Sequence, residues 1–106
     1  MNIELLYFSD CPSWQYTLAS LEQIFESHHL QVEIKLIQVE TKEEAELHQF
    51  YGSPTIKVNG KDLFPIEQGD YHLGCRVYKT PSGYKGSPSK EMIEEMLGEF
   101  FKKETN

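Results

Sequence analysis

Two cysteines are the residues of this chain whose side chains could do covalent chemistry. Cys11 stands in the stretch YFSDCPSW, directly before Pro12, and Cys75 stands in HLGCRVYK, 64 positions later. A cysteine thiolate is a nucleophile and a ligand for soft metal ions. Position 14, where a C-x-x-C motif would place a second cysteine, is occupied by Trp14. Dithiol exchange within that motif is therefore excluded.

The residues around Cys11 predict a strand, a turn and a helix. The stretch NIELLYFS at 2–9 contains β-branched and aromatic residues and is followed by polar residues and a proline, as in a buried strand that ends in a turn. Pro12 suits the first position of a helix, which would make Cys11 its N-cap. Apolar residues then recur every three or four positions to about His29, as in an amphipathic helix.

A second strand and a second helix follow. In QVEIKLIQV at 31–39, apolar residues alternate with polar ones, so the two strands and the helix between them would form a parallel βαβ unit. Thr41 and Glu44 have the spacing of a capping box, which predicts a short helix that ends at Gly52. The apolar side chains in and after this helix are expected to face the sheet: Ala45, Leu47, Phe50 and Tyr51.

The second half of the chain predicts a hairpin, a long loop and a last helix. Asn59-Gly60, within SPTIKVNGKDLF at 53–64, is a strong signal for an antiparallel hairpin. Residues 65–87 are expected to form an ordered loop insertion with one short strand, CRVY at 75–78. The stretch SPSKEMIEEMLGEFFKK at 87–103 begins with a serine cap and has an apolar stripe, which predicts a helix that packs on the sheet.

Length and charge exclude several classes of protein. A chain of 106 residues, with 39% hydrophobic and 25% charged residues, predicts a single globular domain over residues 1–106. The net charge of −7 repels phosphate backbones and anionic lipid surfaces, so neither nucleic acid nor a membrane is expected as a partner. Without a signal peptide pattern the chain is expected to be cytoplasmic, where both thiols would be free.

The order β-α-β-α-β-β-α, the cysteine turn FSDCPSW and the loop GSPTIKVNG together resemble the thioredoxin fold family and its glutaredoxin-like branch. The resemblance spans residues 2–64 and 88–103. It implies an α/β fold of three layers, with a four-stranded mixed sheet and an extra loop before the last helix. A narrower resemblance, to small bacterial thioredoxin-like proteins labelled alkylmercury-lyase-like, rests on CPSW, SPTIKVNG, GCRVY and GSPS.

The resemblance implies roles for the residues around the first cysteine. Cys11 would lie at a helix N-terminus, where the helix dipole favours the thiolate, while the neighbouring Asp10 opposes that effect. Pro54 would follow a cis peptide bond and sit against Cys11, and the main chain of Ser53 would be free to pair with a thiol-bearing substrate. Trp14 would either cover the sulfur beside the substrate or belong to the packed core.

The position of Cys75 leaves two interpretations open. In glutaredoxin-like proteins the loop after the hairpin lies on the side of the active thiol, which would let Cys75 resolve an adduct on Cys11. Alternatively, Cys75 points from a short strand into the core. Bridging requires Cα atoms within about 7 Å. His72, three residues before Cys75, would complete a soft-metal set, although an isolated loop histidine is more often a surface residue.

The leading hypothesis is a thiol-disulfide oxidoreductase or monothiol glutaredoxin-like protein, with Cys11 as the nucleophile and Cys75 as the resolving thiol. The substrate would be a thiol or a disulfide, and glutathione is one candidate. It would be bound by Ser53, Pro54 and Trp14. No resident metal or cofactor is expected. One alternative is a protein that captures mercury or copper(I) between two thiolates, and another is an adaptor that keeps the fold without the chemistry.

Overall fold

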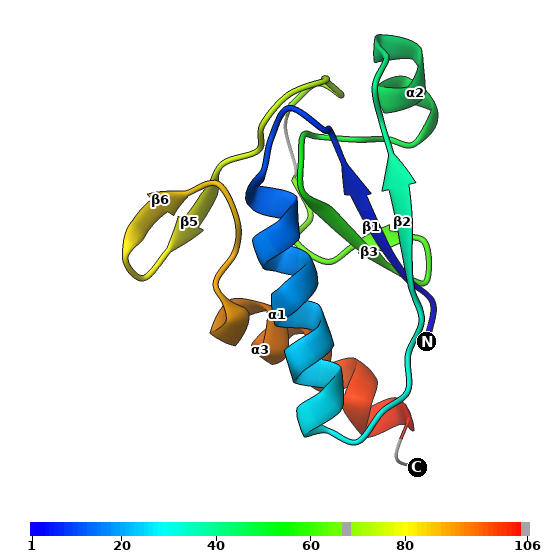
Figure 1. Cartoon of the computed structure of the whole chain (residues 1–106), viewed down its shortest axis with the longest axis vertical. Helices are drawn as coiled ribbons and strands as arrows, with labels where there is room; N and C mark the ends of the chain where they lie inside the picture. The colour runs from blue at the N-terminus through cyan, green and yellow to red at the C-terminus, as the bar shows by residue number, and fades with distance from the viewer. Residues whose placement is uncertain (67–68, 105–106) are drawn as a thin grey trace.

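A four-stranded mixed sheet forms the centre of the structure (Figure 1), a computed structural model that describes residues 1–66 and 69–104. Its strands are β1 (Ile3–Tyr7), β2 (Ile34–Gln38), β3 (Thr55–Val58) and β4 (Lys61–Asp62), in the order β2-β1-β3-β4. β1 is parallel to β2 and antiparallel to β3, and β3 is antiparallel to β4. The predicted α/β fold with a mixed four-stranded sheet is therefore confirmed.

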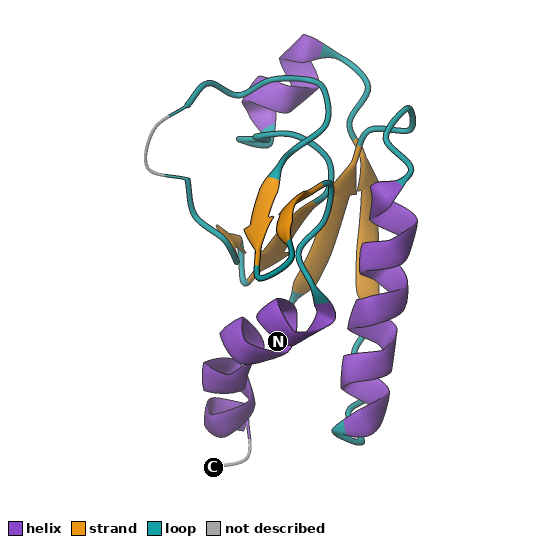
Figure 2. Cartoon of the chain, turned by 90° about the vertical axis from the view of Figure 1, so that its left-hand side faces the viewer, coloured by secondary structure: helices purple, strands orange, loops and turns teal. Residues whose placement is uncertain are grey.

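Three helices surround this sheet: α1 (Ser13–Ser27), α2 (Lys42–Leu47) and α3 (Lys90–Glu104). The two long helices, α1 and α3, contact each other and share one apolar core with the sheet (Figure 2). Within the described ranges, no helix has both the length and the apolar content that crossing a bilayer requires.

The alternation of side chains along β1 places core residues on both faces of the sheet. Ile3 and Leu5 point toward α1 and α3, whereas Leu6 points to the opposite face. The larger cluster is buried between the sheet and the long helices: Ile3, Leu5, Leu21, Ile24, Phe25, Ile56, Val58, Leu63, Ile93, Leu97 and Phe101. The smaller cluster involves α2: Leu6, Val39, Ala45 and Phe50. β1 is thus held from both sides where it leads into the Cys11 turn.

Two local signals in the sequence are confirmed. Thr41 is the N-cap of α2, because the Glu44 N–H donates to Thr41 Oγ1 at 3.1 Å. Asn59 and Gly60 have φ angles of 54° and 85°, and they connect β3 to β4. Positive φ at both central residues is what a type I′ hairpin turn requires.

The ends of α1 differ from the prediction. Its N-cap is Pro12 rather than Cys11, and the helix ends at Ser27 rather than near His29. Pro12 has helical angles (φ −70°, ψ −11°), and its carbonyl accepts a hydrogen bond from the Gln15 N–H at 3.1 Å. The first helical residue is therefore Ser13, one position later than predicted. Cys11 therefore belongs to the turn immediately before the helix.

α2 is also shorter than predicted. It ends at Leu47 instead of at Gly52, and Gln49 then adopts a left-handed conformation with a φ of 52°. That turn redirects the chain and brings Phe50 back into the core beside Ala45, as predicted. The expectation for Leu47 is wrong, because its side chain is 77% exposed.

The segment at 65–87 contains a second hairpin that was not expected from the sequence. β5 (Tyr78–Thr80) and β6 (Gly83–Lys85) pair antiparallel and project from the body of the structure (Figure 1). The prediction of a strand at 75–78 is wrong except for Tyr78, which is the first residue of β5. Cys75, at the start of that stretch, instead forms an isolated parallel bridge with Ser53, the residue before Pro54.

The packing of α3 generates a stability prediction. Leu97→Ala should lower the free energy of unfolding by about 2–5 kcal/mol, because Leu97 is completely buried and its truncation leaves a cavity. Met96→Ala, on the same helix but 41% exposed, should change it by about 0.5 kcal/mol or less. Urea denaturation of both variants without reductant measures the difference. Equal losses would contradict the packing of α3 described above.

Candidate functional site

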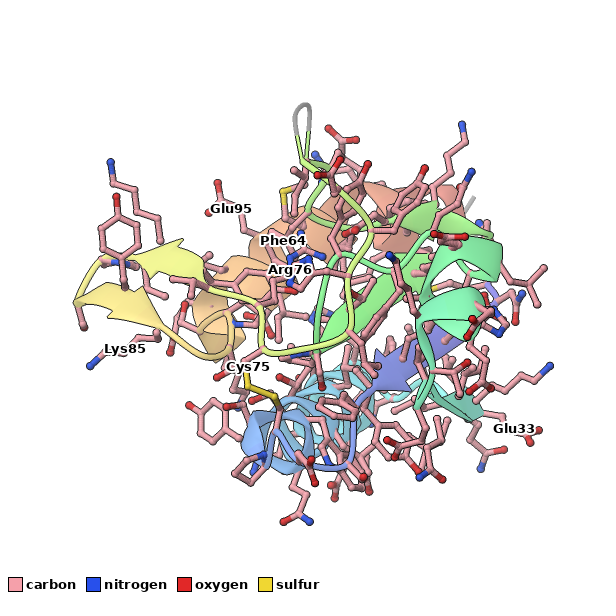
Figure 3. All side chains as sticks on the ribbon, turned by 90° about the horizontal axis from the view of Figure 1, so that it is seen from above. Glu33, Phe64, Cys75, Arg76, Lys85 and Glu95 are labelled. Carbon is pink, nitrogen blue, oxygen red and sulfur yellow. A yellow bond between two sulfur atoms is a disulfide. The ribbon has the colours of Figure 1, made fainter. Side chains whose placement is uncertain are left out.

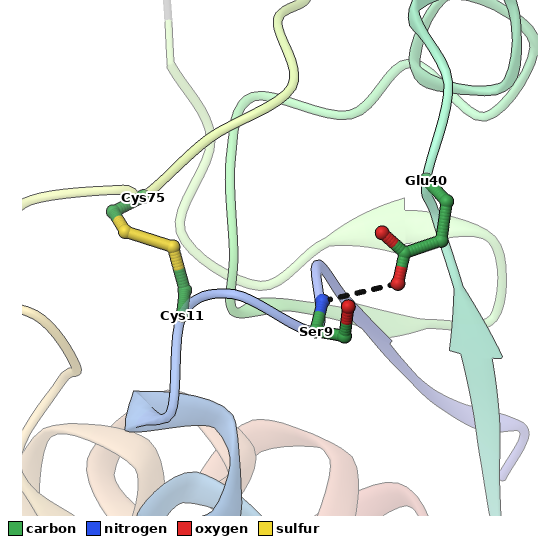
Figure 4. The surroundings of a disulfide bond; sticks show 4 residues. All are labelled: Ser9, Cys11, Glu40 and Cys75. Carbon is green, nitrogen blue, oxygen red and sulfur yellow. Dashed lines mark hydrogen bonds between the residues drawn. A yellow bond between two sulfur atoms is a disulfide. The ribbon is translucent and has the colours of Figure 1, made fainter.

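Cys11 and Cys75 form a disulfide bond, with their Cα atoms 5.8 Å apart (Figure 4). The expectation of two free thiols is therefore wrong for this structure. Of the two interpretations of Cys75, proximity to Cys11 is correct, and burial in the core is wrong because residue 75 is exposed. Cys11 itself is only 2% exposed. The bond thus joins a buried residue to an exposed one.

The turn that contains Cys11 is held by main-chain and side-chain hydrogen bonds. The Cys11 N–H donates to the Phe8 carbonyl at 3.0 Å. The Ser9 N–H donates to the Glu40 carboxylate at 3.3 Å (Figure 4). The side-chain amide of Gln38 donates to the same carboxylate, and these two donors, Gln38 first, hold the pKa of Glu40 below its usual range. The end of β1 is in this way tied to the end of β2.

The main chain of Ser53 pairs with the segment that contains Cys75. The Ser53 N–H donates to the Gly74 carbonyl at 2.7 Å, and the Arg76 N–H donates to the Ser53 carbonyl at 2.9 Å. These two bonds make a parallel bridge between Ser53 and Cys75. The Ser53–Pro54 peptide bond is cis, as the resemblance implied. The expectation that the Ser53 main chain is free for a substrate is wrong, because the chain itself uses both groups.

Side chains along this segment alternate between solvent and interior. Cys75, Val77 and Lys79 are exposed, whereas Arg76 and Tyr78 are buried. This period of two is that of an extended chain with one face against the protein. The outward face therefore presents the cysteine, and the inward face provides the anchors.

Arg76 is the first of these anchors and is the only arginine in the chain. Its guanidinium donates to the Asp62 carboxylate at 2.9 Å, to Thr55 Oγ1 at 3.3 Å and to the Phe64 carbonyl. It also lies over the Tyr78 ring, 4.6 Å from the centroid. Figure 3 shows Arg76 beside Phe64, with Cys75 further along the same segment. These contacts fix the Cys75 segment to β3, β4 and the residues after β4.

Tyr78 is the second anchor. Its hydroxyl donates to the Pro54 carbonyl, and its ring packs edge-on against Phe64 with centroids 5.5 Å apart. Burial raises the pKa of the Tyr78 phenol far above its usual range, so the hydroxyl stays a neutral donor at all ordinary pH values. The side chains of Arg76 and Tyr78 therefore hold the segment against Pro54 and the residues that follow it. Neither residue was expected at the site from the sequence, although the alternation in CRVYK was a signal for them.

Trp14 lies on the first turn of α1. Its ring stacks on Tyr7 with centroids 4.2 Å apart, and it packs against the larger core cluster while remaining partly exposed. This packing corresponds to the second of the two interpretations of Trp14, a residue of the apolar stripe. The stacking joins the end of β1 to the start of α1, on either side of the Cys11 turn.

His72 does not assemble a metal site with the two cysteines. Its side chain is exposed, and its Nδ1 lies 3.1 Å from the Asp70 carbonyl. Among the residues that the structure describes, no group of three or more histidine, cysteine, aspartate or glutamate side chains is arranged to hold a metal ion. The sequence-based set of Cys11, Cys75 and His72 is thus not formed with the disulfide closed.

Ser53 has one further property that the sequence did not indicate. In the part of the chain that the structure describes, its Oγ is buried and has no hydrogen-bond partner. A nearby buried hydroxyl, Thr55 Oγ1, donates to the Gly52 carbonyl at 2.7 Å and accepts from Arg76. Buried polar atoms are nearly always paired, so the Ser53 hydroxyl stands out among the side chains next to the Cys75 segment.

Comparison of the chain with models of known protein families, with curated proteins and with solved structures found no match in any of the three.

The Arg76 contacts generate a prediction about stability. Arg76→Met should lower the free energy of unfolding by about 3 kcal/mol, because it leaves the largely buried Asp62 carboxylate without its cation. Lys79→Met removes an exposed charge from the same segment and should change it by about 0.5 kcal/mol or less. Chemical denaturation of the oxidised proteins compares the two. Similar losses in both variants would show that Arg76 is no anchor.

The two buried hydroxyls generate a second prediction. Thr55→Val removes a paired hydroxyl and should lower the free energy of unfolding by about 1 kcal/mol. Ser53→Ala removes an unpaired one and should lower it by less, or raise it, because no hydrogen bond is lost. Thermal or urea denaturation of the oxidised proteins measures both. A loss in Ser53→Ala as large as that in Thr55→Val would mean that the Ser53 hydroxyl has a partner.

Proposed function

We propose that this protein is a thiol-disulfide oxidoreductase whose redox pair is Cys11 and Cys75. The observation that supports the proposal best is the disulfide between these residues, which joins the turn before α1 to an exposed, anchored segment. Such a pair can be reduced to two thiols and closed again, while the anchors keep the second cysteine near the first. The pair replaces the C-x-x-C motif that Trp14 rules out.

The proposal includes a thioredoxin-like architecture with an inserted hairpin. Two observations support it: the order of the elements outside β5 and β6, and the cis peptide bond between Ser53 and Pro54 next to the disulfide segment. In this proposal Pro54, Ser53 and Trp14 form the surroundings of the reactive sulfur atoms. The Ser53 main chain binds the chain's own segment in the oxidised state, and a substrate would compete for it only after that segment moves.

A cytoplasmic location, expected from the sequence, would favour a redox role over a structural one. Disulfides in reducing compartments are mostly transient and belong to catalytic or redox-sensing sites. In the proposed reaction two substrate thiols lose two electrons and two protons to the protein disulfide, which becomes two thiols, and the substrate becomes a disulfide. The reverse reaction reduces a substrate disulfide. Glutathione is one candidate substrate, and the net charge of −7 disfavours nucleic acid as a partner.

One alternative function uses the same two sulfur atoms. Once reduced, Cys11 and Cys75 would be two thiolates on converging segments, a donor set suited to mercury or copper(I). Titration of the reduced protein with either ion, while the free thiols are counted, tests this function. Loss of both thiols with one ion, in a protein that shows no thiol-disulfide turnover, would favour capture of the ion over redox catalysis.

The proposal predicts a reducible and catalytically required disulfide. Equilibration of the protein with dithiol buffers should give a reduction potential less negative than about −300 mV, the range below which structural disulfides usually lie. Cys11→Ser and Cys75→Ser should each lower dithiol-driven disulfide reduction to the uncatalysed rate, because one thiol cannot close the bond. Ser27→Ala, at the opposite end of α1, should keep the wild-type rate. A potential well below −300 mV together with unchanged rates would contradict the proposal.

A further inference from the structure

We infer that Cys75, and not Cys11, is the sulfur at which an outside thiol or disulfide reacts, and that Cys11 is the internal leaving and resolving thiol. The inference rests on the proposed function and reverses the roles that the sequence suggested. It is carried by three independent features of the structure: exposure, the place of Cys11 before α1, and the anchoring of the Cys75 segment.

Exposure separates the two sulfur-bearing residues. Cys11 is 2% exposed, in a turn closed by the hydrogen bond from its N–H to Phe8, while Cys75 is exposed on the outward face of its segment. Val77, the next outward residue, is 66% exposed, so the surface beside Cys75 is open as well. Rates of thiol-disulfide exchange depend on access to the attacked sulfur. A thiol from solvent therefore reaches Cys75 first.

The place of each sulfur in the fold also makes Cys11 the better leaving group. Cys11 lies in the turn before α1, one residue ahead of the N-cap Pro12, and the N-terminal N–H groups and dipole of this 15-residue helix favour a nearby thiolate. Asp10 opposes this effect, but its side chain is exposed and screened by solvent. Cys75 belongs to an extended segment between β4 and β5, and it reaches the start of α1 only through its bond to Cys11. Negative charge that develops on the Cys11 sulfur as the bond breaks is stabilised by this helix end, so the bond breaks toward Cys11.

The anchors keep Cys75 in place through both steps. In the first step a thiolate attacks Cys75 Sγ, a bond forms between the two sulfur atoms, and the electron pair of the broken disulfide goes to Cys11 Sγ. In the second step another thiolate attacks the substrate sulfur of this adduct, releasing the substrate disulfide and the Cys75 thiolate. The contacts of Ser53, Arg76 and Tyr78 that hold the segment involve neither sulfur atom. In the opposite direction Cys75 attacks the substrate, and Cys11 resolves the adduct.

Mapping the first adduct tests the inference in the wild-type protein. The oxidised protein is mixed with a large excess of 2-mercaptoethanol, quenched within the first turnover with N-ethylmaleimide and digested for mass spectrometry. We expect the mercaptoethanol adduct on Cys75 and the maleimide on Cys11. An adduct mainly on Cys11, an equal division between the two, or no adduct under native conditions would each overturn the inference.

A charge-matched pair of variants tests it by rate. Val77→Glu places a negative charge beside Cys75, and Gln15→Glu places one on the exposed first turn of α1 near Cys11. At low salt, Val77→Glu should slow attack by the anionic thiol 3-mercaptopropionate about twofold relative to neutral 2-mercaptoethanol, with a smaller effect in Gln15→Glu. A larger effect in Gln15→Glu would overturn the inference.

The test is separable from the proposed function. Neither measurement needs catalysis, because both follow the reaction of one disulfide with a small thiol in excess. If the protein turns over fully as an oxidoreductase but forms its first adduct on Cys11, the proposed function holds and the inference is wrong. If the protein shows no turnover but forms its first adduct on Cys75, the inference about the attacked sulfur holds and the proposed function is wrong.

Discussion

The contact on which the site depends is the pairing of Ser53 with the chain around Cys75. Two main-chain hydrogen bonds, from Ser53 to Gly74 and from Arg76 to Ser53, bring a segment from after the sheet to the residue before the cis peptide bond. Without this pairing nothing in the order of the strands would place Cys75 near Cys11. The hairpin of β5 and β6 is positioned by the same contact, because it continues directly from the paired segment.

The anchoring of that segment explains why one arginine is buried in a protein whose other nine positive residues are lysines. Burial of a charge is unfavourable unless the charge is paired and its donors are used. The planar fork of Arg76 reaches Asp62, Thr55 and the Phe64 carbonyl at once, which the single nitrogen of lysine could not do in the same geometry. The acceptors come from two strands and the residues beyond them, so the contact joins separate parts of the fold.

The sequence predicted the features whose causes are local. The capping box at Thr41 and the turn at Asn59-Gly60 depend on residues within a few positions, and the core faces of the long helices follow from their period. The β5–β6 hairpin had a weaker signal, a Pro81-Ser82-Gly83 turn in which Gly83 has a φ of 108°. The closure of Cys11 on Cys75 had no local signal, and the resemblance left it as one of two interpretations, because it results from pairing between distant segments and from the buried contacts of Arg76.

The disulfide also divides the chain into a covalent ring and the parts outside it. The ring runs from residue 11 to residue 75 and includes α1, β2, α2, β3 and β4, while β1, the second hairpin and α3 lie outside. In the chain-entropy description, closing a ring of this size stabilises the folded state by about 4 kcal/mol. A protease that cuts one peptide bond inside the ring leaves a single molecule whose two pieces stay joined through sulfur. Reduction then removes the covalent link between the piece that contains β1 and the remainder, and only non-covalent contacts still join the two pieces.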